Sequence, residues 1–512
     1  MAAHELNPQW QLSDLLSGMM AVSPKQERTI FGLTLDSREV LPGSLFLACA
    51  GGTSHGLDFL RQVVEKGAAA ILCEAGGDWS QSRIEGLADE SQVPLLYVPG
   101  LSQQLSLLAA RFHNDPSSDL TVIGFTGTNG KTSCTQFLAE ALRETTPCGL
   151  VGTLGSGFPG SLVMGRHTTP GPVELQATLA DLREHGAQAV AMEVSSHALN
   201  QGRVAAVHFD LAVLTNLSRD HLDFHGDMAE YAAAKQCLFE CPDLGCAVLN
   251  LDDPFGWQLL DAIAADVPVV AYGLSRPERP IPAQVEAWLW ASEVVPTEQG
   301  LHIKLETSWG DGCFDSALLG RFNASNLLAV LAVLLKHGMP LELAMQRLAK
   351  LTTVSGRMEH FGGGTQPLVV VDYAHTPDAL EQVITALRPH ASGRLCCVFG
   401  CGGDRDQGKR PLMGAIAERL ADLVILTDDN PRGEDGDQII ADILAGMKRP
   451  DAAKVQRNRA VAIDQAIAAA TAGDLVLVSG KGHETVQQCG DLRLHFSDLE
   501  QVQNNLNEGE NG

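Results

Sequence analysis

One segment combines glycines, a lysine and a threonine in an order that suits phosphate binding. It reads Thr126, Gly127, Thr128, Asn129, Gly130, Lys131 and Thr132. It follows a strand-like apolar run and precedes a helical pattern, so backbone amides and a helix N-terminus would cradle phosphate oxygens. The Lys131 ammonium would neutralise β- and γ-phosphates, and the Thr132 hydroxyl would bind Mg²⁺. Because Phe125 stands at the first glycine position of the strict motif, an ordinary glycine-rich turn is the alternative.

Acidic residues and histidines further along the chain could complete a metal site. Glu193 ends an apolar strand-like run, a position that suits a metal-binding acid and equally suits a buried capping acceptor. His221, Asp223 and His225 alternate; an extended backbone would place them on one face, and a solvated turn is the alternative. Lys235 lies in an Ala-rich helical pattern, where a lysine is ordinarily a solvated surface residue.

A second constellation lies near the C-terminal end. Asp429, Asn430, Pro431 and Arg432 place an acceptor, an amide and a guanidinium within four residues. Such a set could grip both the ammonium and the carboxylate that an amino acid carries on one carbon. Arg405 also lies beside loop glycines, which suits a held guanidinium. A proline turn with an incidental salt bridge is the alternative.

The elements that must position these residues have the pattern of parallel α/β sheets. From residue 120 onward, short β-rich apolar runs alternate with amphipathic segments. Further strands, each followed by polar residues, are predicted at residues 368–372, 395–400, 423–427 and 475–479. Ligands of open α/β sheets bind at the carboxyl ends of strands, so a second binding face is expected there. A helix is predicted at residues 323–337, and the polar tail 504–512 is predicted to be disordered.

The chain length and the predicted breaks between apolar segments indicate three α/β domains. At about 150 residues per domain, 512 residues are enough for three separate cores. Breaks are expected at Pro99-Gly100 and near residues 351–356. The predicted domains are therefore residues 1–99, 100–354 and 355–512.

The charge balance restricts the partners. Lys and Arg number 36 against 62 Asp and Glu, for a net charge of −26. Such acidity argues against binding to nucleic acid or to an anionic membrane surface. No apolar run reaches the ~18 residues needed to span a bilayer, and no export signal is recognised at the start. Twelve cysteines without paired metal-binding spacing predict reduced thiols in a cytoplasmic protein. Local cations would therefore have to hold any anionic substrate.

Taken in order, these motifs resemble the Mur ligases of bacterial peptidoglycan synthesis over nearly the whole chain. The matching segments are residues 126–132, 193–197, 216–225, 320–326, 356–359 and 372–377. Residues 429–432 are similar to the motif of the MurE branch, which adds meso-diaminopimelate. The resemblance implies an N-terminal UDP-sugar-binding α/β domain, a central P-loop ATPase domain with a parallel sheet, and a C-terminal Rossmann-like domain that binds the amino acid.

The activity implied by the resemblance is ATP-dependent amide ligation through an acyl phosphate. The implied small-molecule substrates are ATP, UDP-N-acetylmuramoyl-L-alanyl-D-glutamate and meso-2,6-diaminopimelate, with Mg²⁺ as cofactor. The enzyme would be a cytoplasmic monomer, without nucleic acid and without membrane insertion. The alternatives are a lysine-adding relative, a folylpolyglutamate-synthase-like ligase or, from another class, a nucleotide-binding scaffold without catalysis.

The resemblance also implies residue roles around ATP. Besides residues 126–132, ATP would contact Asn323, Asn326, Arg357 and Asp372. Thr132, Glu193, His221 and Lys235 would hold metal, the last as a carbamate (N6-carboxylysine) that serves a second Mg²⁺. The implied catalytic residues are Lys131, Glu193, His221 and Lys235.

Two further ligand sets follow from the same resemblance. The UDP-sugar would contact Leu35, Ser37, Gly52, Thr53, Ser54, His167, Thr168, Thr169, Ser195, Gln201 and Arg203. Diaminopimelate would contact Arg405, Asp429, Asn430, Pro431, Arg432, Gly480 and Glu484. Relatives carry His-Gln-Ala at residues 52–54, and some carry Asn at residue 167; contacts through the backbone are compatible with both departures.

Overall fold

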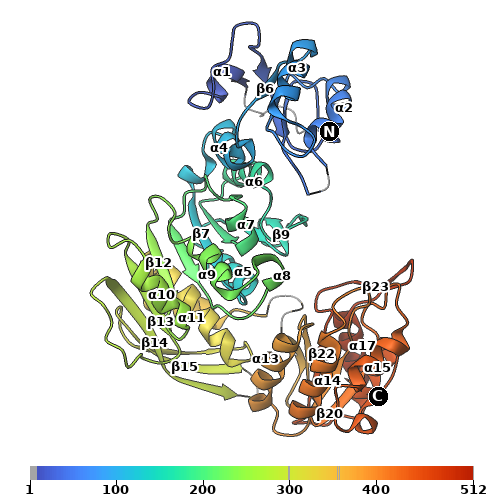
Figure 1. Ribbon diagram of the computed structural model, residues 1–512. Helices are drawn as coiled ribbons and strands as arrows, with labels where there is room; N and C mark the ends of the chain where they lie inside the picture. Colours follow the sequence, from blue (N-terminus) through green and yellow to red (C-terminus); the bar gives the residue numbers. More distant parts are fainter. Residues whose placement is uncertain (1–8, 53, 298–299, 354–355, 357, 511–512) are drawn as a thin grey trace. The chain divides into compact units, whose positions relative to one another are not determined.

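A computed structural model describes residues 9–52, 54–297, 300–353, 356 and 358–510. The chain forms two compact units, Met1–Val270 and Ala271–Gly512, and each is described by itself. Both units are built from sheets covered by helices (Figure 1), so the α/β prediction is confirmed. Among the residues described, we find no helix with the length and apolar character required to cross a bilayer.

The first unit begins with a parallel four-stranded sheet. Its strands, in spatial order, are β3 (Gly32–Thr34), β4 (Ser44–Ala48), β5 (Ala70–Cys73) and β6 (Leu95–Tyr97). In β4, Leu45 and Leu47 face a core with α1 (Leu12–Leu15) and α4 (Leu101–Phe112). Phe46 and Ala48 face a second core with α2 (Leu60–Glu65) and α3 (Gln81–Glu90). Alternating side chains therefore bury both faces of this sheet.

A second sheet of the first unit carries the glycine-rich segment. The strands are β7 (Thr121–Thr126), β8 (Cys148–Gly152), β9 (Gly155–Gly157), β10 (Ala189–Glu193), β11 (Leu211–Leu214) and β12 (Cys246–Asn250), in the spatial order β12-β11-β7-β10-β8-β9. All pair in parallel except β9. The helices are α5 (Lys131–Leu142), α6 (Pro172–Glu184), α7 (Ser196–Asn200), α8 (Leu222–His225), α9 (Met228–Gln236) and α10 (Pro254–Ala262). In Figure 1, α6 lies beside α4.

The boundary between the two units falls within β13 (Val269–Gly273), and the second unit continues with an antiparallel ribbon and a buried helix. The ribbon consists of β14 (Val285–Thr297), β15 (Gly300–Thr307) and β16 (Gly312–Ser316). The predicted helix at residues 323–337 is confirmed as α11 (Arg321–Lys336), which is followed by α12 (Leu341–Ala349). The helix α11 is rich in leucine, alanine and valine, and it is buried along most of its length. This composition suits a helix that packs against other elements on several sides.

The C-terminal part of the second unit is a six-stranded sheet in the order β17-β18-β22-β19-β20-β21. Its strands are β17 (Glu359–Gly362), β18 (Leu368–Asp372), β19 (Leu395–Phe399), β20 (Leu423–Leu426), β21 (Lys454–Val455) and β22 (Leu475–Ser479), parallel except for β17. The four strands predicted in this region are confirmed.

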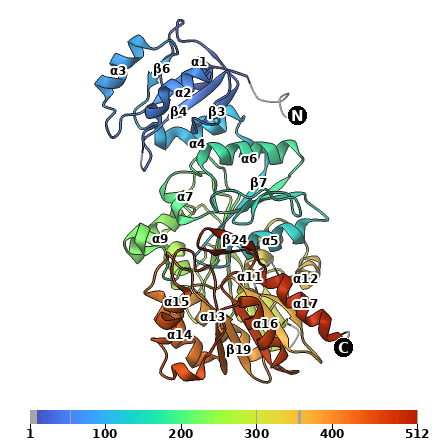
Figure 2. The same ribbon diagram turned by 90° about the vertical axis from the view of Figure 1, so that its right-hand side faces the viewer.

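Helices cover both faces of this sheet. Figure 2 shows α14 (Lys409–Leu420) and α15 (Gly436–Leu444) on one side of β19, and α16 (Arg459–Ala468) and α17 (Asp498–Glu510) on the other. The helix α13 (Pro377–Leu387) lies on the side of α14. A hairpin of β23 (Val486–Cys489) and β24 (Leu492–His495) follows β22.

The prediction of a disordered tail is wrong for residues 504–510. These residues belong to α17, which extends to Glu510. The helix is held because Val502 is buried in the core formed with α16, with Leu499 and Leu506 packed against it. The polar composition of the tail concealed this apolar spacing of three and four residues.

Candidate active site

The glycine-rich segment lies at the carboxyl end of β7, between the ends of two parallel neighbours. β10 pairs with β7 so that Glu193 lies opposite Phe125, and β11 pairs so that Leu214 lies opposite Thr126. Because parallel strands point the same way, this register brings the residues after all three strands to one edge of the sheet. The predicted phosphate loop and the predicted metal-binding acid are therefore neighbours.

Residues that follow β11 hold the loop in shape. The Asn216 carbonyl accepts a hydrogen bond from the Thr128 amide at 2.9 Å, and the Asn216 side-chain oxygen accepts one from the Asn129 amide at 3.0 Å. The Thr215 hydroxyl donates to the Asn129 carbonyl at 2.6 Å. Gly127 has a φ of 149°, and a Cβ there would lie 1.9 Å from Thr215 Oγ1. Only glycine fits this close approach.

Two lysine side chains converge on the same loop. Lys131 Nζ donates to the carbonyls of Gly127 at 2.8 Å and Thr128 at 3.0 Å. Lys235 Nζ, from α9, donates to the Gly127 carbonyl at 2.9 Å, and this side chain is only 1% exposed. Burial lowers the pKa of Lys235 well below its ordinary value, and the charge of Lys131 lowers it further. The surface location that the local sequence suggested for Lys235 is therefore wrong.

Glu193 joins the start of α5 to the segment that follows β8. Its Oε2 accepts hydrogen bonds from the hydroxyls of Thr132 at 2.9 Å and Thr153 at 3.2 Å, and its Oε1 accepts one from the Thr153 amide at 2.8 Å. A Cβ on Gly152 would lie 2.3 Å from Glu193 Oε1, so the glycine admits the buried carboxylate. Carboxylate and hydroxyl oxygens are ligands that Mg²⁺ prefers, and this cluster fits a hard cation.

The extended face predicted for His221 and His225 is not formed. His221 has a φ of 52° and directly precedes the short helix α8. The ring of His197 lies 4.9 Å from that of His221 and 5.5 Å from that of His225. Across the described ranges, no three or more His, Cys, Asp or Glu side chains are grouped so that they could hold a metal ion. A metal site here would therefore need other ligand types, such as the Thr132 hydroxyl.

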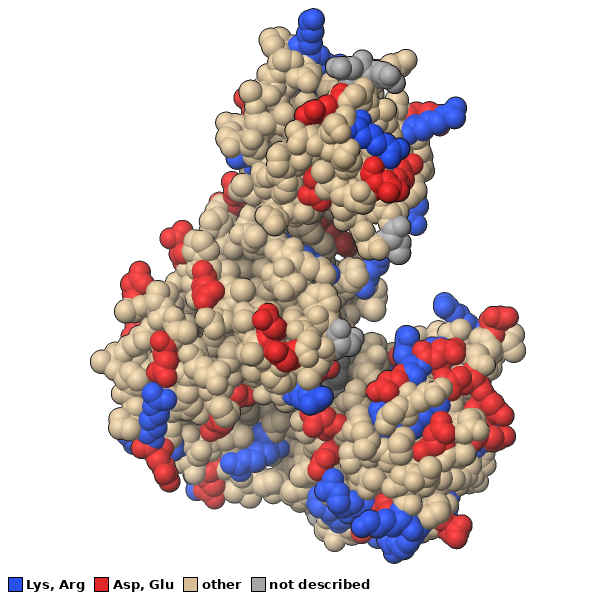
Figure 3. Space-filling view, viewed as in Figure 1, with Lys and Arg blue, Asp and Glu red and all other residues tan. Residues whose placement is uncertain are grey.

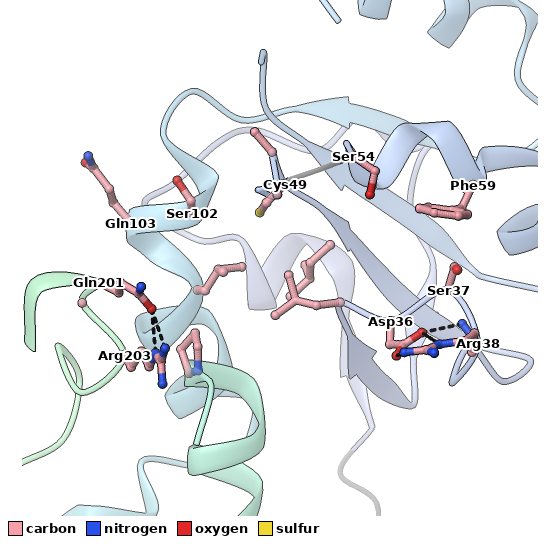
Figure 4. A pocket seen from close by; sticks show the side chains of 18 of the residues that line it. Asp36, Ser37, Arg38, Cys49, Ser54, Phe59, Ser102, Gln103, Gln201 and Arg203 are labelled. Carbon is pink, nitrogen blue, oxygen red and sulfur yellow. Dashed lines mark hydrogen bonds and ion pairs between the residues drawn. The ribbon is translucent and has the colours of Figure 1, made fainter. Parts of the chain in front are cut away.

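A pocket of about 1270 Å³ lies in the first unit, between the β3–β6 sheet and the residues after α7 (Figure 4). Five of the residues predicted to bind the UDP-sugar line it: Leu35, Ser37, Ser54, Gln201 and Arg203. Asp36 and Arg38 also line it and form an ion pair at 2.6 Å. The hydrogen bonds from Arg38 lower the pKa of Asp36 to about 2. The pocket is large enough for a nucleotide-sized ligand.

One side of this pocket is connected to Glu193 through two hydrogen bonds. Arg203 Nη1 donates to the Thr169 carbonyl at 2.8 Å, and Arg203 Nη2 donates to Gln201 Oε1 at 2.6 Å. The buried Thr169 hydroxyl donates to the Glu193 carbonyl at 2.8 Å and lies 3.2 Å from Ser195 Oγ. The structure thus brings Thr169, Ser195, Gln201 and Arg203 together, as the resemblance implied.

In the second unit, Asn323, Asn326 and Asp372, which are predicted to meet the nucleotide, are buried and hydrogen-bonded within the protein. Asn323 Nδ2 donates to the Leu319 carbonyl at 2.8 Å, and Asn326 Nδ2 donates to Asn323 Oδ1 at 3.1 Å. Asp372, at the end of β18, accepts the amide of Met358 at 2.8 Å and that of Ala374 at 2.8 Å. These bonds fix the first turns of α11 and the end of β18, on which the predicted side chains lie.

The predicted amino-acid site lies at the carboxyl ends of β19, β20 and β22. Arg432 has a φ of 51°, and its Nη1 donates to the Gly403 carbonyl at 2.8 Å. A Cβ on Gly402 would lie 2.8 Å from Arg432 Nη1 and 3.7 Å from Arg405 Cγ, so the two guanidinium-bearing chains flank one glycine. A Cβ on Gly480, where φ is 120°, would lie 2.5 Å from Asp429 Oδ2. The absence of a side chain at Gly402 therefore leaves room for the two arginines, and its absence at Gly480 leaves room for the aspartate.

Charged side chains of both signs are interleaved on the C-terminal part of the second unit (Figure 3). The net charge of −26 therefore does not make this face uniformly negative. Each of the three candidate sites contains a local cation: Lys131 lies at the phosphate loop, Arg203 at the pocket, and Arg405 and Arg432 at the amino-acid site.

Comparison with known proteins decides the family. Three family models match successive parts of the chain: the Mur ligase family catalytic domain at residues 29–113, the Mur ligase middle domain at residues 125–334, and the Mur ligase glutamate ligase domain at residues 356–482. A relative from Pseudomonas aeruginosa is 52% identical over 94% of this chain and 96% of its own length. The chain belongs to the Mur ligase family.

Other members share the fold and much of the sequence. The Pseudomonas protein and one from Alkalilimnicola ehrlichii, 50% identical over 98% of this chain and 99% of its own, are both named UDP-N-acetylmuramoyl-L-alanyl-D-glutamate–2,6-diaminopimelate ligase. A solved structure with that name superimposes with a TM-score of 0.73 at 33% identity, covering 98% of this chain and all of the other.

Some of the predicted ligand-binding residues of this Mur ligase lie away from the predicted sites or outside the described residues. Thr53 and Arg357 lie outside the described residues. Gly52 and His167 are exposed and do not line the pocket. The Thr168 hydroxyl lies 3.1 Å from that of Thr153 and so belongs to the Glu193 cluster.

Two residues of these clusters were not predicted. Thr153 bonds both carboxylate oxygens of Glu193, but it follows β8 in a segment with no recognisable motif. Lys481 is fully buried and bonds Asn430 and Glu484. The polar run that starts at Lys481, directly after a predicted strand, was the signal that could have identified it.

Proposed function

We propose that this Mur ligase joins meso-2,6-diaminopimelate to UDP-N-acetylmuramoyl-L-alanyl-D-glutamate, with ATP as co-substrate. The observation that carries the proposal is the similarity, at 52% and 50% identity over nearly the full length, to two ligases named for this reaction. The amino-acid site supports it, because two arginines and several acceptors suit a substrate with two carboxylates and two ammonium groups.

In the first step, the γ-phosphate of ATP is transferred to the side-chain carboxylate of the D-glutamate, which leaves ADP and an acyl phosphate. The amides of residues 126–132 and the start of α5 bind the phosphates. Lys131, which donates to the carbonyls of Gly127 and Thr128 of the same loop, would turn its ammonium toward the γ-phosphate. The loop thereby stabilises the negative charge that moves between the two substrates.

The residues around Glu193 fit Mg²⁺. The buried carboxylate and the Thr132 hydroxyl are hard oxygen ligands at the first turn of α5. We assign the metal to Thr132, Glu193, His221 and a carbamate on Lys235. When bound, Mg²⁺ supplies positive charge that offsets the charge of the phosphate oxygens.

Lys235 has the properties that carbamate formation requires. Its lowered pKa favours the neutral amine, whose nitrogen lone pair can bond the carbon of CO₂. One proton leaves the nitrogen, and the product is a carboxylate at the end of the lysine chain. The modified side chain then offers oxygen ligands in place of a buried amine next to Lys131.

In the second step, an amine of diaminopimelate attacks the acyl-phosphate carbon. A tetrahedral intermediate forms, phosphate leaves with the electrons of the broken C–O bond, and the nitrogen loses a proton as the amide forms. Arg405 and Arg432 hold the distal carboxylate of the substrate, to which the Asn430 Nδ2 group also donates, while Asp429 and Glu484 hold the distal ammonium. The sugar nucleotide occupies the pocket near Ser37 and Arg203.

The remaining proposals concern organisation. We propose domain limits at residues 1–99, 100–354 and 355–512. The enzyme acts as a monomer in the cytoplasm, where ATP and UDP-sugars are available, and it does not bind nucleic acid.

The test is phosphate release from ATP in the presence of Mg²⁺ and UDP-N-acetylmuramoyl-L-alanyl-D-glutamate. Separate reactions contain meso-diaminopimelate, L-lysine, L-glutamate or no amino acid. We expect release with diaminopimelate and background release in the others. Equal rates with lysine would overturn the diaminopimelate assignment, and release with glutamate would favour the folylpolyglutamate-synthase-like alternative.

A further inference from the structure

A buried lysine lies beneath the proposed amino-acid site. Lys481 follows β22, and its side chain is 0% exposed. An ammonium removed from water destabilises the fold unless it is paired and hydrogen-bonded. The groups that compensate this charge therefore indicate what the residue does.

All three N–H groups of the Lys481 ammonium have acceptors. Lys481 Nζ donates to Glu484 Oε2 at 2.9 Å, to Asn430 Oδ1 at 3.2 Å and to the Val486 carbonyl at 2.8 Å. One buried atom thus connects the loop after β20, the loop after β22 and the start of β23. Two of its three acceptors are side chains that we assign to the distal end of the substrate.

These bonds determine which way the Asn430 amide points. Its Oδ1 faces Lys481 Nζ and also the Gln488 amide, at 2.9 Å. Both partners are donors only, so the oxygen of the side chain must face them. The Nδ2 group is consequently turned toward Glu484 Oε2, to which it donates at 2.9 Å.

Glu484 is held from beneath and remains accessible from above. Its Oε2 accepts from both Lys481 and Asn430, whereas its side chain is 33% exposed. Burial raises the pKa of Glu484, but the hydrogen bond and charge of Lys481, together with the hydrogen bond from Asn430 and the charge of His483, outweigh burial, so this pKa lies below its ordinary value. The carboxylate is therefore ionised and available to an ammonium that enters from solvent.

We propose that Lys481 is a positioning residue of the amino-acid site, which orients the Asn430 Nδ2 group for the distal carboxylate of the substrate and Glu484 for its distal ammonium, without contacting the substrate. This role rests on the proposed function, because that function assigns both side chains to diaminopimelate. Removal of the ammonium would leave Asn430 Oδ1 with one donor and Glu484 without its cation. Substrate affinity would then fall although every residue that touches the substrate is unchanged.

The test compares Lys481→Met with Lys454→Met in the full-length enzyme. Lys454 lies exposed on β21 of the same sheet, so it controls for loss of one lysine charge. The measurements are the KM values for meso-diaminopimelate, ATP and the UDP-sugar dipeptide, together with kcat. For Lys481→Met we expect a rise in the diaminopimelate KM of about 10-fold or more, and ATP and UDP-sugar KM values within about 2-fold of wild type. Lys454→Met should match wild type throughout.

Lys481→Gln is the second variant, because it keeps a hydrogen-bond donor and removes the charge. We expect its diaminopimelate KM to lie between those of wild type and Lys481→Met, and it decides the test if Lys481→Met does not fold. An unchanged diaminopimelate KM, equal rises in all three KM values, or a failure of both variants to fold would overturn the positioning role. Wild-type enzyme without diaminopimelate-dependent phosphate release would instead reject the proposed function, and the positioning role with it.

Discussion

Lys131 and Lys235 donate hydrogen bonds to the same atom, the carbonyl oxygen of Gly127, over 2.8 Å and 2.9 Å. Two ammonium groups on one acceptor repel each other, and only Lys235 is deeply buried. Burial and the charge of Lys131 therefore lower the pKa of Lys235, which favours its neutral amine. Lys235, which comes 104 positions after Lys131 in the chain, therefore directly contacts the phosphate loop.

Replacing Lys235 by Ala should lower kcat by about 100-fold or more, because it removes the proposed carboxylate from the metal site. Lys235→Arg should be equally impaired, since a guanidinium does not form the carbamate. Added short carboxylates should restore part of the activity of Lys235→Ala only. Mass spectrometry of the wild type should detect one added CO₂. Lys25→Ala, on the exposed surface of the same unit, is the control; full turnover by Lys235→Ala without added carboxylate would contradict the assignment.

Replacing Arg432 by Ala should raise the KM for diaminopimelate by about 10- to 100-fold, with little change in the KM for ATP. The reason is the loss of a charge-assisted contact to a substrate carboxylate. Steady-state kinetics with each substrate varied in turn measures the effect. Arg419→Ala, which breaks only an exposed ion pair with Glu381, should behave as wild type. Matching increases in both KM values would show that Arg432 is structural.

Replacing Gly480 by Ala should weaken diaminopimelate binding and lower the melting temperature. The new Cβ would lie 2.5 Å from Asp429 Oδ2 and would occupy a φ of 120°, strain that costs about 1–3 kcal/mol. Gly490 also has a positive φ, 59°, but a Cβ there meets nothing within 4 Å. Gly490→Ala should therefore lower the melting temperature less and leave the diaminopimelate KM unchanged. Equal effects of the two substitutions would exclude the contact with Asp429 as the cause.

His390 makes the stability of the second unit depend on pH. Its Nε2 accepts the Gly320 amide at 3.0 Å, and its Nδ1 lies 2.7 Å from the Thr297 carbonyl. Burial lowers the pKa of His390, against the smaller opposing effect of the bond to Thr297. Because the unfolded chain takes up the proton more readily, the stability from this group is present above the ordinary histidine pKa and is lost as pH falls below it.

Thermal unfolding between pH 5 and about pH 8 tests this dependence. We expect the melting temperature of the wild type to fall toward the acid side more steeply than that of His390→Gln, which does not titrate. His185→Gln changes an exposed histidine and should follow the wild-type curve. Parallel curves for His390→Gln and wild type would rule out His390 as the titrating group.

The phosphate loop could be predicted from the sequence because strand, loop and helix are adjacent in the chain. The same holds for the residues at the carboxyl end of β18, since apolar runs with a polar end have a local pattern. The burial of Lys235 could not be predicted in this way. It depends on the approach of α9 to Gly127, a contact between residues 108 positions apart, and an Ala-rich helix has no clear apolar face.

The histidine segment shows a second limit. An alternation of polar residues is compatible with a strand, a turn or a short helix, and local spacing does not choose among them. The structure forms α8 because His221 adopts a left-handed conformation and His197 from another segment packs on both histidines. Such a contact between distant segments leaves no periodic trace in the sequence.

The close approach of Gly480 and Asp429 also limits how this enzyme could be redesigned for another amine. A side chain at position 480 is admitted only if the aspartate is shortened or moved, and the aspartate belongs to the same loop as Asn430, which Lys481 holds. Changes made one at a time at these positions would each pass through a poorly fitting intermediate. A library that varies positions 429, 430, 480 and 481 together would sample combinations that single substitutions never reach.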